Sequence, residues 1–578
     1  MDEIDNTKKT TGIFANKKLL ILLLLILSLG IFVRLYKFSD VGYWSDDEST
    51  LPTGLLWFFP HNFYPGLLGQ GEPALGNYII AKGCMMSGED FSGVTQIQRR
   101  FYPGREILIG KQLVNANNYC HAPMYIFSIL FLLAITLLSF LLLKKLGAIL
   151  VIGLVSFNTF MLVFGRWIHV DMMLYTFVTL GLIALFKSLK SQKGSISEKI
   201  WWIIAIAMMA LSFSTKLPSS VYIVFSGIVI SVKYWNEVMA IFQKGCRLLD
   251  LEIIKGHSET PHQKSFLYII GLAFIVYFGI LFFTFEGFAN IPAVIEAYRV
   301  QGAEFGTLNF YRGSIASLIR ILKTFSNLEM IFLIATIAYF PFLLKKSLKG
   351  SIEEKFIASL ILLFLIMPAI APSMKLERVF FLFSFGWFLS AGMLMDNLIS
   401  RFKSFRNNLF IVAMLLIFSI PVFNAVYTSP DFLSDYKLYN ILNSPTKISW
   451  SSNNFGARPI GEYLQGLLKE NETYFPAEPM TMVTYYVKNN QQLQYYLFRE
   501  NFKAKVGRSP TVHEYIQYFQ PNNERIKYLL IDKYTQNNEE FVQDILQNYE
   551  PMHIIYQPSI RKVETIRVYD LDNLVKKK

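Results

Sequence analysis

The chain has 578 residues, of which 53% are hydrophobic, 16% are aromatic and only 17% are charged. A soluble domain carries about 25% charged residues, so the composition argues against a purely soluble enzyme and excludes a disordered chain or a coiled coil. The net charge of +13 is shared by nucleic-acid-binding proteins and by membrane proteins whose basic residues gather on one side of the bilayer. Three cysteines are too few for a disulfide scaffold or a structural zinc site.

Apolar runs of near-spanning length predict about eleven transmembrane helices. The first, residues 19–33, follows Lys17 and Lys18, and no small-residue cleavage site comes after it. It is therefore expected to remain as the first span and not to be removed as a signal peptide. The other runs cover residues 124–143, 148–165, 172–186, 201–215, 217–232, 266–285, 328–344, 356–371, 379–395 and 408–427.

Basic residues predict the orientation of these spans. If the N-terminus is cytoplasmic, every predicted inside segment carries Lys or Arg, as the positive-inside rule expects. Much of the net charge is then a topology signal, and no nucleic-acid partner is predicted. An odd number of spans places the C-terminus outside the cytoplasm.

The predicted outer side carries two long segments, 37–120 and 286–327, and a separate C-terminal region. From about residue 428 the sequence becomes polar, with strand-like runs at 480–487, 528–531, 554–556 and 566–571 and a helix-like run at 541–547. The fold-class prediction is an α-helical polytopic membrane protein. It has a transmembrane domain over residues 1–427 and a soluble extracytoplasmic α/β domain over residues 428–578.

Unusual charges gather on this outer side. Asp46, Asp47 and Glu48 lie together soon after the first span. The short outer turns supply Arg166, Asp171, Lys216, Lys375 and Arg378. Removing a charge from water beside apolar helices is costly, so a ligand or partner is the expected reason for each. The middles of the spans are nearly free of the ionisable groups that an ion-coupled transporter carries.

This distribution suits the transfer of a sugar from a polyprenyl-phosphate carrier. Lys or Arg would bind the phosphate and neutralise the charge that develops as it leaves. One carboxylate would take the proton from the acceptor hydroxyl as that hydroxyl attacks the anomeric carbon. A hydrolytic glycosidase instead needs two opposed carboxylates, one of them to protonate a poor leaving group.

Five short motifs, in order along residues 19–398, resemble those of membrane glycosyltransferases of the GT-C superfamily. Asp47-Glu48 looks like the DE of their first outer loop, and Thr215-Lys216 resembles the T-K turn of the lipid A aminoarabinose transferase. Residues 71–81 are similar to the H-P-P-L-x-K-x-L-I-A segment of protein O-mannosyltransferases, and residues 165–174 to their S-R-Y-I-x-x-D-x-x-L. Residues 373–378 resemble a later K-x-x-R turn.

The resemblance implies a polyprenyl-phosphate-sugar donor, a mannose-like sugar as the first guess, and an inverting mechanism with the first-loop Asp as base. The chain departs from the family pattern at Glu72 and Ala74, which replace a His and a Pro, and at Asn77, which replaces a Lys. It also has no β-trefoil domain. These differences put the acceptor in doubt more than the donor. A protein Ser or Thr hydroxyl is the first choice, and a lipid or glycan hydroxyl is the second.

Each catalytic candidate has a plainer alternative. Asp47 is the expected base, with Asp46 one register position away and Glu48 beside it, although all three could form a solvated acidic cap. Asp171 either pairs with Arg166 across a turn or acts directly in the site.

Each phosphate-binding candidate also has a plainer alternative. Arg166, Lys216, Lys375 and Arg378 are the candidates, and Arg378 is favoured for its bidentate fork. The alternative for such cations is to extend toward lipid headgroups.

Several further questions stay open from the sequence. His61, His121 and His169 are expected to be hydrogen-bonded structural residues, and no spacing indicates a metal site, although a carboxylate-bound divalent ion is left open. Arg99, Arg100 and Arg105 are either surface charges or acceptor contacts. Cys84 and Cys120 are both predicted outside, and whether they pair is undecided. A transporter or flippase of lipid-linked sugars is the competing functional class.

Overall fold

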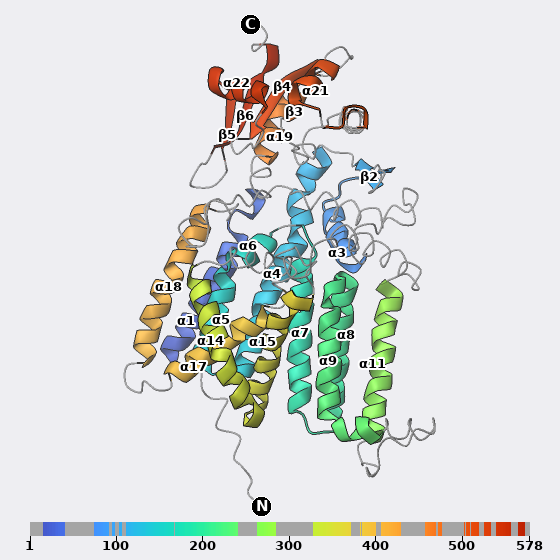
Figure 1. Cartoon of the computed structure of the whole chain (residues 1–578), viewed down its shortest axis with the longest axis vertical. Coiled ribbons are helices and arrows are strands. Elements are labelled where there is room, and N and C mark those ends of the chain that lie inside the picture. Colours follow the sequence, from blue (N-terminus) through green and yellow to red (C-terminus); the bar gives the residue numbers. More distant parts are fainter. Residues whose placement is uncertain are drawn as a thin grey trace, which may run out of the picture.

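The computed structural model describes the chain in separate stretches. These are residues 16–40, 74–91, 95–98, 103–106, 111–166, 168–240, 263–284, 327–370, 382, 384–399, 406–428, 457–469, 472–476, 502, 504–508, 510–519, 525–532, 539–556 and 564–572. Within them the chain is mostly helical, with a small mixed sheet at one end of a helical bundle (Figure 1).

A helix occupies each of the predicted spans. The bundle helices are α1 (Lys17–Leu35), α4 (Lys111–Leu142), α5 (Lys145–Phe157), α6 (Thr159–Phe164), α7 (Asp171–Lys190), α8 (Ile196–Thr215), α9 (Ser220–Lys233), α11 (Gln263–Thr284), α14 (Asn327–Lys349), α15 (Ile352–Ile370), α17 (Phe385–Ile399) and α18 (Arg406–Thr428). One predicted span, 148–165, is broken at Asn158 into α5 and α6.

Length and composition distinguish nine of these twelve helices. Among the described residues, α1, α4, α7, α8 and α14 are long and apolar enough to cross a membrane, and four further apolar helices are shorter. The helices thus support a multi-pass integral membrane protein, but they do not confirm the number eleven.

The short helix α5 forms the centre of the bundle. Every residue from Leu146 to Phe157 is buried, and α1, α4, α17 and α18 pack around it. The first turn is capped from α17, because the carboxylate of Asp396 accepts hydrogen bonds from the backbone N–H groups of Lys144 and Gly147, both at 2.8 Å. A Cβ at Gly147 would lie 2.3 Å from the carbonyl oxygen of Gly392, so glycine is needed for this close helix packing.

The predicted outer segment 37–120 contains regular structure that the sequence patterns did not indicate. It includes the 3-10 turn η2 (Phe38–Asp40), the helix α3 (Ala74–Met85) and an antiparallel hairpin of β1 (Thr95–Gln98) and β2 (Pro103–Glu106). The helix α4 begins within this segment, at Lys111, well before the predicted span starts at residue 124.

The C-terminal sheet has the strand order β3-β4-β6-β5. Its strands are β3 (Glu472–Pro476), β4 (Arg525–Asp532), β5 (His553–Tyr556) and β6 (Glu564–Asp570), and its helices are α19 (Ala457–Leu467), α21 (Val512–Phe519) and α22 (Glu540–Asn548). β3 and β4 are parallel, and the other pairs are antiparallel. Three of the predicted strands and the predicted helix match β4, β5, β6 and α22, whereas the predicted strand at 480–487 lies outside the described residues.

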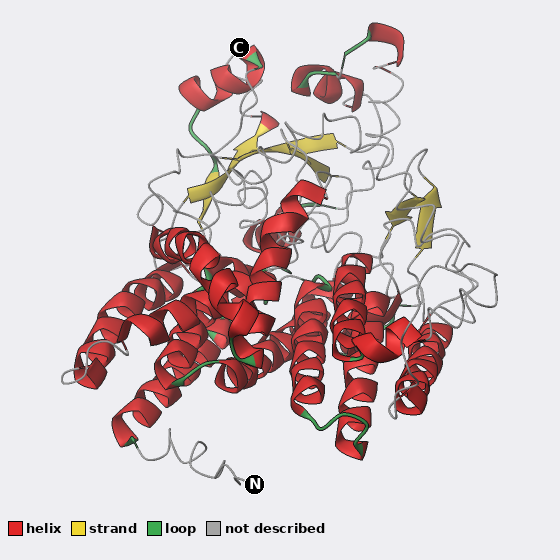
Figure 2. Cartoon of the chain, turned by 60° about the horizontal axis from the view of Figure 1, so that its bottom comes forward, coloured by secondary structure: helices red, strands yellow, loops and turns green. Residues whose placement is uncertain are grey.

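Both faces of the sheet are buried, as the alternation along β4 shows. Leu529 and Ile531 pack with Val542 and Ile545 of α22. Tyr528 and Leu530 belong to a second apolar cluster that also includes residues of α3, α4 and the start of α7. The sheet is thereby joined to one end of the bundle, which we call the sheet end; the opposite end is the far end (Figure 2).

Candidate functional site

The structure describes three of the eight predicted site residues. Asp171, Arg166 and Lys216 are placed, whereas Asp46, Asp47, Glu48, Lys375 and Arg378 lie outside the described residues. The three placed residues lie where the helices of the sheet end begin or stop.

Asp171 and Lys216 form a buried ion pair. The Lys216 Nζ lies 2.9 Å from Asp171 Oδ1, and His169 Nδ1 lies 3.0 Å from Asp171 Oδ2. All three residues are at most 5% exposed. We call these three residues the Asp171 cluster.

The pairing of α7 and α8 explains how residues 45 positions apart meet. α7 begins at Asp171, α8 ends at Thr215, and the short turn between Lys190 and Ile196 makes the two helices antiparallel. An acid in the first turn of α7 and a base just after the last turn of α8 both complement the helix dipoles. Lys216 itself adopts an extended conformation, and η4 (Leu217–Ser219) follows it.

Arg166 has a different environment from the one the sequence suggested. Its Nη2 donates hydrogen bonds to the carbonyl oxygens of Val33 and Tyr36, both at 2.7 Å, at the C-terminal end of α1. The last carbonyl groups of a helix lack partners within it, so Arg166 caps α1. Asp171 forms an ion pair with Lys216.

A second buried arginine caps the break between α5 and α6. Arg34 donates to the carbonyl oxygens of Ser156 at 2.8 Å and Val155 at 3.2 Å, and to the Ser128 hydroxyl at 3.0 Å. The sequence shows Arg34 only as a charge flanking the first span. Arg34 has these partners because α5 ends at Phe157, which frees the carbonyl groups that it binds.

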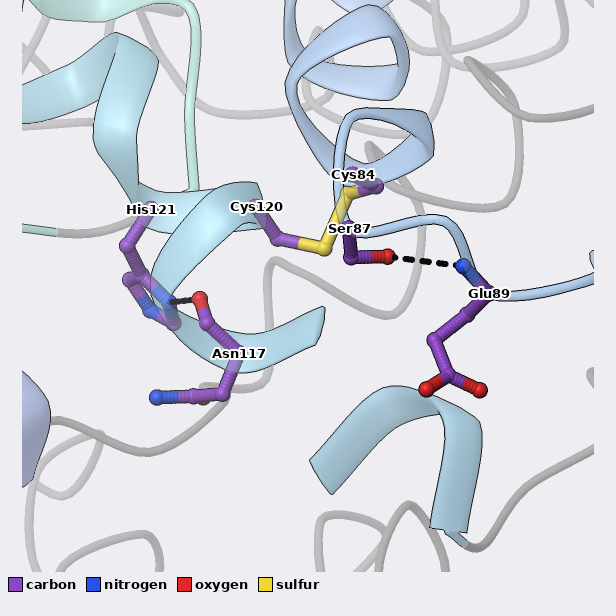
Figure 3. The surroundings of a disulfide bond; sticks show 6 residues. All are labelled: Cys84, Ser87, Glu89, Asn117, Cys120 and His121. Atoms are coloured by element: carbon purple, nitrogen blue, oxygen red, sulfur yellow. Dashed lines mark hydrogen bonds between the residues drawn. A yellow bond between two sulfur atoms is a disulfide. The ribbon is translucent and has the colours of Figure 1, made fainter. Parts of the chain in front are cut away.

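A disulfide between Cys84 and Cys120 joins α3 to α4 (Figure 3). Beside it, His121 Nδ1 lies 2.8 Å from the carbonyl oxygen of Asn117, one turn earlier in α4. Disulfides persist in oxidising compartments outside the cytoplasm. At the sheet end, Cys84 and Cys120 share an apolar cluster with sheet residues.

The remaining candidates give no further site. The described residues contain no group of three or more His, Cys, Asp or Glu side chains that could hold a metal ion. His61, Arg99 and Arg100 lie outside the described residues, and Arg105 is in β2.

One family model matches part of the chain, and several solved structures are similar to it. The family model described as dolichyl-phosphate-mannose-protein mannosyltransferase matches residues 100–299. This stretch contains Arg166, Asp171 and Lys216, and the match confirms the resemblance to GT-C enzymes. No curated protein matches the chain.

Three solved structures align with this chain at low sequence identity. ArnT from Cupriavidus metallidurans, bound to undecaprenyl phosphate, is 9% identical with a TM-score of 0.47, over 94% of this chain and 97% of that one. The Archaeoglobus fulgidus oligosaccharyltransferase is 12% identical with a TM-score of 0.44, over 95% and 73%. The S. cerevisiae protein O-mannosyltransferase Pmt1-Pmt2 complex is 13% identical with a TM-score of 0.31, over 47% and 34%.

Proposed function

We propose that this chain is an inverting glycosyltransferase of the membrane. It would move a sugar from a polyprenyl-phosphate donor to a hydroxyl acceptor at the outer membrane surface. The observation that carries the proposal is the family-model match over residues 100–299, because it covers the buried Asp171–Lys216 pair. Lys216 supplies a cation at the sheet end, where a departing phosphate needs its charge neutralised.

The proposed reaction needs one base and no acid. A carboxylate, Asp47 as first choice and Asp46 as alternative, takes the proton from the acceptor hydroxyl. The hydroxyl oxygen forms a bond to the anomeric carbon, and the bond from that carbon to the phosphate oxygen breaks on the opposite side. Lys216, Lys375 and Arg378 stabilise the phosphate that leaves.

The three site residues that the structure describes have different proposed roles. Arg166 fixes the end of α1 through Val33 and Tyr36, and it is also proposed to bind the phosphate together with the other three cations. Asp171 holds Lys216 in one place and acts as a positioning residue for it. A divalent ion is not required by any step.

The proposal also includes an acceptor class and a membrane topology. A Ser or Thr hydroxyl of a protein is the first acceptor class, and a glycolipid or glycan hydroxyl is the second. The N-terminus is cytoplasmic, and the active site and the C-terminal domain are extracytoplasmic. The disulfide at the sheet end supports this orientation.

Mass spectrometry of glycoproteins and glycolipids from cells with and without the gene tests the proposal. We expect one hexose-type modification to disappear from a set of extracytoplasmic proteins when the gene is absent. A lost glycolipid modification would select the second acceptor class. Unchanged glycans in both fractions, with accumulation of an untransported lipid-linked sugar, would favour the transporter class instead.

A further inference from the structure

The first turn of α3 lies directly against the backbone that carries the Asp171 cluster. A Cβ at Gly76 would lie 2.3 Å from Val170 Cγ1 and 3.3 Å from Thr215 Cγ2. Val170 separates His169 from Asp171, and Thr215 precedes Lys216. Glycine therefore allows α3 to approach both segments, and Asn77 directly follows this point of close approach in the chain.

The other end of α3 fixes the helix in this position. Cys84 is bonded to Cys120 of α4. A Cβ at Gly83 would lie 2.7 Å from the Pro123 ring of α4 and 2.8 Å from the Tyr119 carbonyl oxygen. A helix in such close contact at both ends cannot rotate about its axis, so Asn77 keeps one orientation.

Asn77 carries a buried acceptor that has no partner among the described residues. The residue is 2% exposed, and its Oδ1 makes no hydrogen bond to any residue that the structure describes. Buried polar atoms are nearly always paired, and an exception calls for a reason. An unpaired amide oxygen lowers stability, so a bound substrate that pairs with it would remove that cost.

The chemistry of Oδ1 restricts what this substrate group is. A carboxamide oxygen only accepts hydrogen bonds, and an ionised phosphate diester or monoester near neutral pH offers none to it. A sugar hydroxyl does. We propose that Asn77 accepts a hydrogen bond from a hydroxyl group of the transferred sugar and so helps to determine which sugar is used; this rests on the proposed function.

The difference from the resembled motif at this position also concerns hydrogen bonding. Asn77 stands where that segment has Lys, and a Lys side chain donates but cannot accept. The two side chains therefore offer different hydrogen-bonding groups at this position.

The test compares Asn77→Leu with Thr336→Val in the full-length protein. Thr336, in α14, also has a buried, unpartnered polar atom, but its helix packs on α15 and α17, away from α3. Both variants replace an unpaired polar group with an apolar one of similar size, so both should keep or raise the thermal midpoint without donor. Transfer is measured with undecaprenyl-phosphate and dolichyl-phosphate monosaccharides and with their deoxy analogues.

We expect Asn77→Leu to raise the KM for the preferred donor about 10-fold, the scale of one hydrogen bond, and to lose discrimination against one deoxy analogue. Thr336→Val should change neither. Unchanged donor KM and unchanged deoxy discrimination in Asn77→Leu would overturn the proposal, as would an increase confined to the acceptor KM. If the wild-type protein transfers no sugar from any of these donors, the proposed function fails and this inference fails with it.

Discussion

The helices α7 and α8 carry a buried charge cluster at each end, and the two clusters are built differently. At the far end, Glu198 lies 2.5 Å from Lys233 Nζ and accepts hydrogen bonds from the Tyr234 hydroxyl at 2.7 Å and the Gly194 N–H at 2.5 Å. At the sheet end, Asp171 lies between Lys216 and His169. Both clusters place a carboxylate of this helix pair beside a lysine: Glu198 of α8 lies beside Lys233 of α9, and Asp171 of α7 lies beside Lys216.

The turn between the helices accounts for the far-end cluster. Ser195 accepts a hydrogen bond from the Glu198 N–H at 3.1 Å, and the Glu198 side chain reaches back to Gly194, which resembles a capping box. Lys233 also donates to the carbonyl oxygens of Ser188 and Ser191 as α7 ends. These charges therefore close a turn and stabilise the fold.

No comparable turn accounts for the sheet-end cluster. Asp171 begins one helix and Lys216 follows the end of another, and the chain does not connect the helices there. The far-end pair caps the turn that it closes, and its role is structural. In the sheet-end pair each charge complements the dipole of its own helix, but the pair closes no turn between α7 and α8, so it is the candidate for substrate binding.

The largest expected effect concerns the proposed base. Asp47→Asn should lower the transfer rate by about 10²–10⁴-fold, the usual contribution of a general base, at unchanged expression and thermal midpoint. The measurement is initial transfer rate with purified protein. Asp46→Asn is the matched control, and if both variants keep full activity, the base is neither residue.

The far-end cluster should govern stability and not activity. Removing one partner of a buried ion pair costs about 3–5 kcal/mol, so Lys233→Met should markedly lower the free energy of unfolding, measured by denaturation in detergent. Lys190→Met is the control, because its pair with Glu353 is 48% exposed at the lysine and should contribute about 0–1 kcal/mol. Equal losses in the two variants would remove the distinction between the clusters.

The disulfide should have an intermediate effect. The bond joins two cysteines with a sequence separation of 36. The double variant Cys84→Ser/Cys120→Ser should lower the free energy of unfolding by about 2–4 kcal/mol. Thermal unfolding of the double variant measures this, with Cys246→Ser as control. If adding a reductant leaves the thermal midpoint of the wild-type protein unchanged, the prediction is contradicted.

The smallest effect belongs to the C-terminal region, far from both clusters. Hydrogen bonds from the Arg508 guanidinium, and then from Thr511, lower the pKa of Glu514 from 4.5 to about 2. A lowered carboxyl pKa gives stability that is fully present above pH 4.5 and is lost as the pH falls toward 2. Glu514→Gln should flatten the acid dependence of unfolding in this window, but only slightly because the pair is exposed; an unaltered profile would remove Glu514 as its source.

Hydropathy predicted the helices well because burial in lipid requires long apolar runs. Every predicted span holds a helix, and β4, β5, β6 and α22 lie where period-2 and helical patterns placed them. α3 was missed, since its burial depends on Gly76 and Gly83 meeting other helices, which no local pattern reports.

The sequence allowed the charged residues of the site to be predicted, but not which of them pair with one another. Outer charges such as Asp171 and Lys216 were selected because charges beside apolar helices are costly. Which of them meet depends on helix pairing: the turn after Lys190 brings Lys216 to Asp171, and the break at Asn158 gives Arg34 its carbonyl partners. Asn77 gave no signal beyond its departure from a resembled motif, because an unpaired buried atom exists only in three dimensions.

The affinity for a polyprenyl-phosphate sugar, measured on Lys216→Met and Lys233→Met side by side, tests the central claim most directly. Both lysines are partners of buried carboxylates on the same helix pair. We predict that Lys216→Met weakens donor binding by about 10-fold or more, the scale of a lost charge-assisted hydrogen bond, and that Lys233→Met binds donor as the wild-type protein does. Equal donor affinity in both variants and the wild type would contradict a substrate role for the Asp171 cluster.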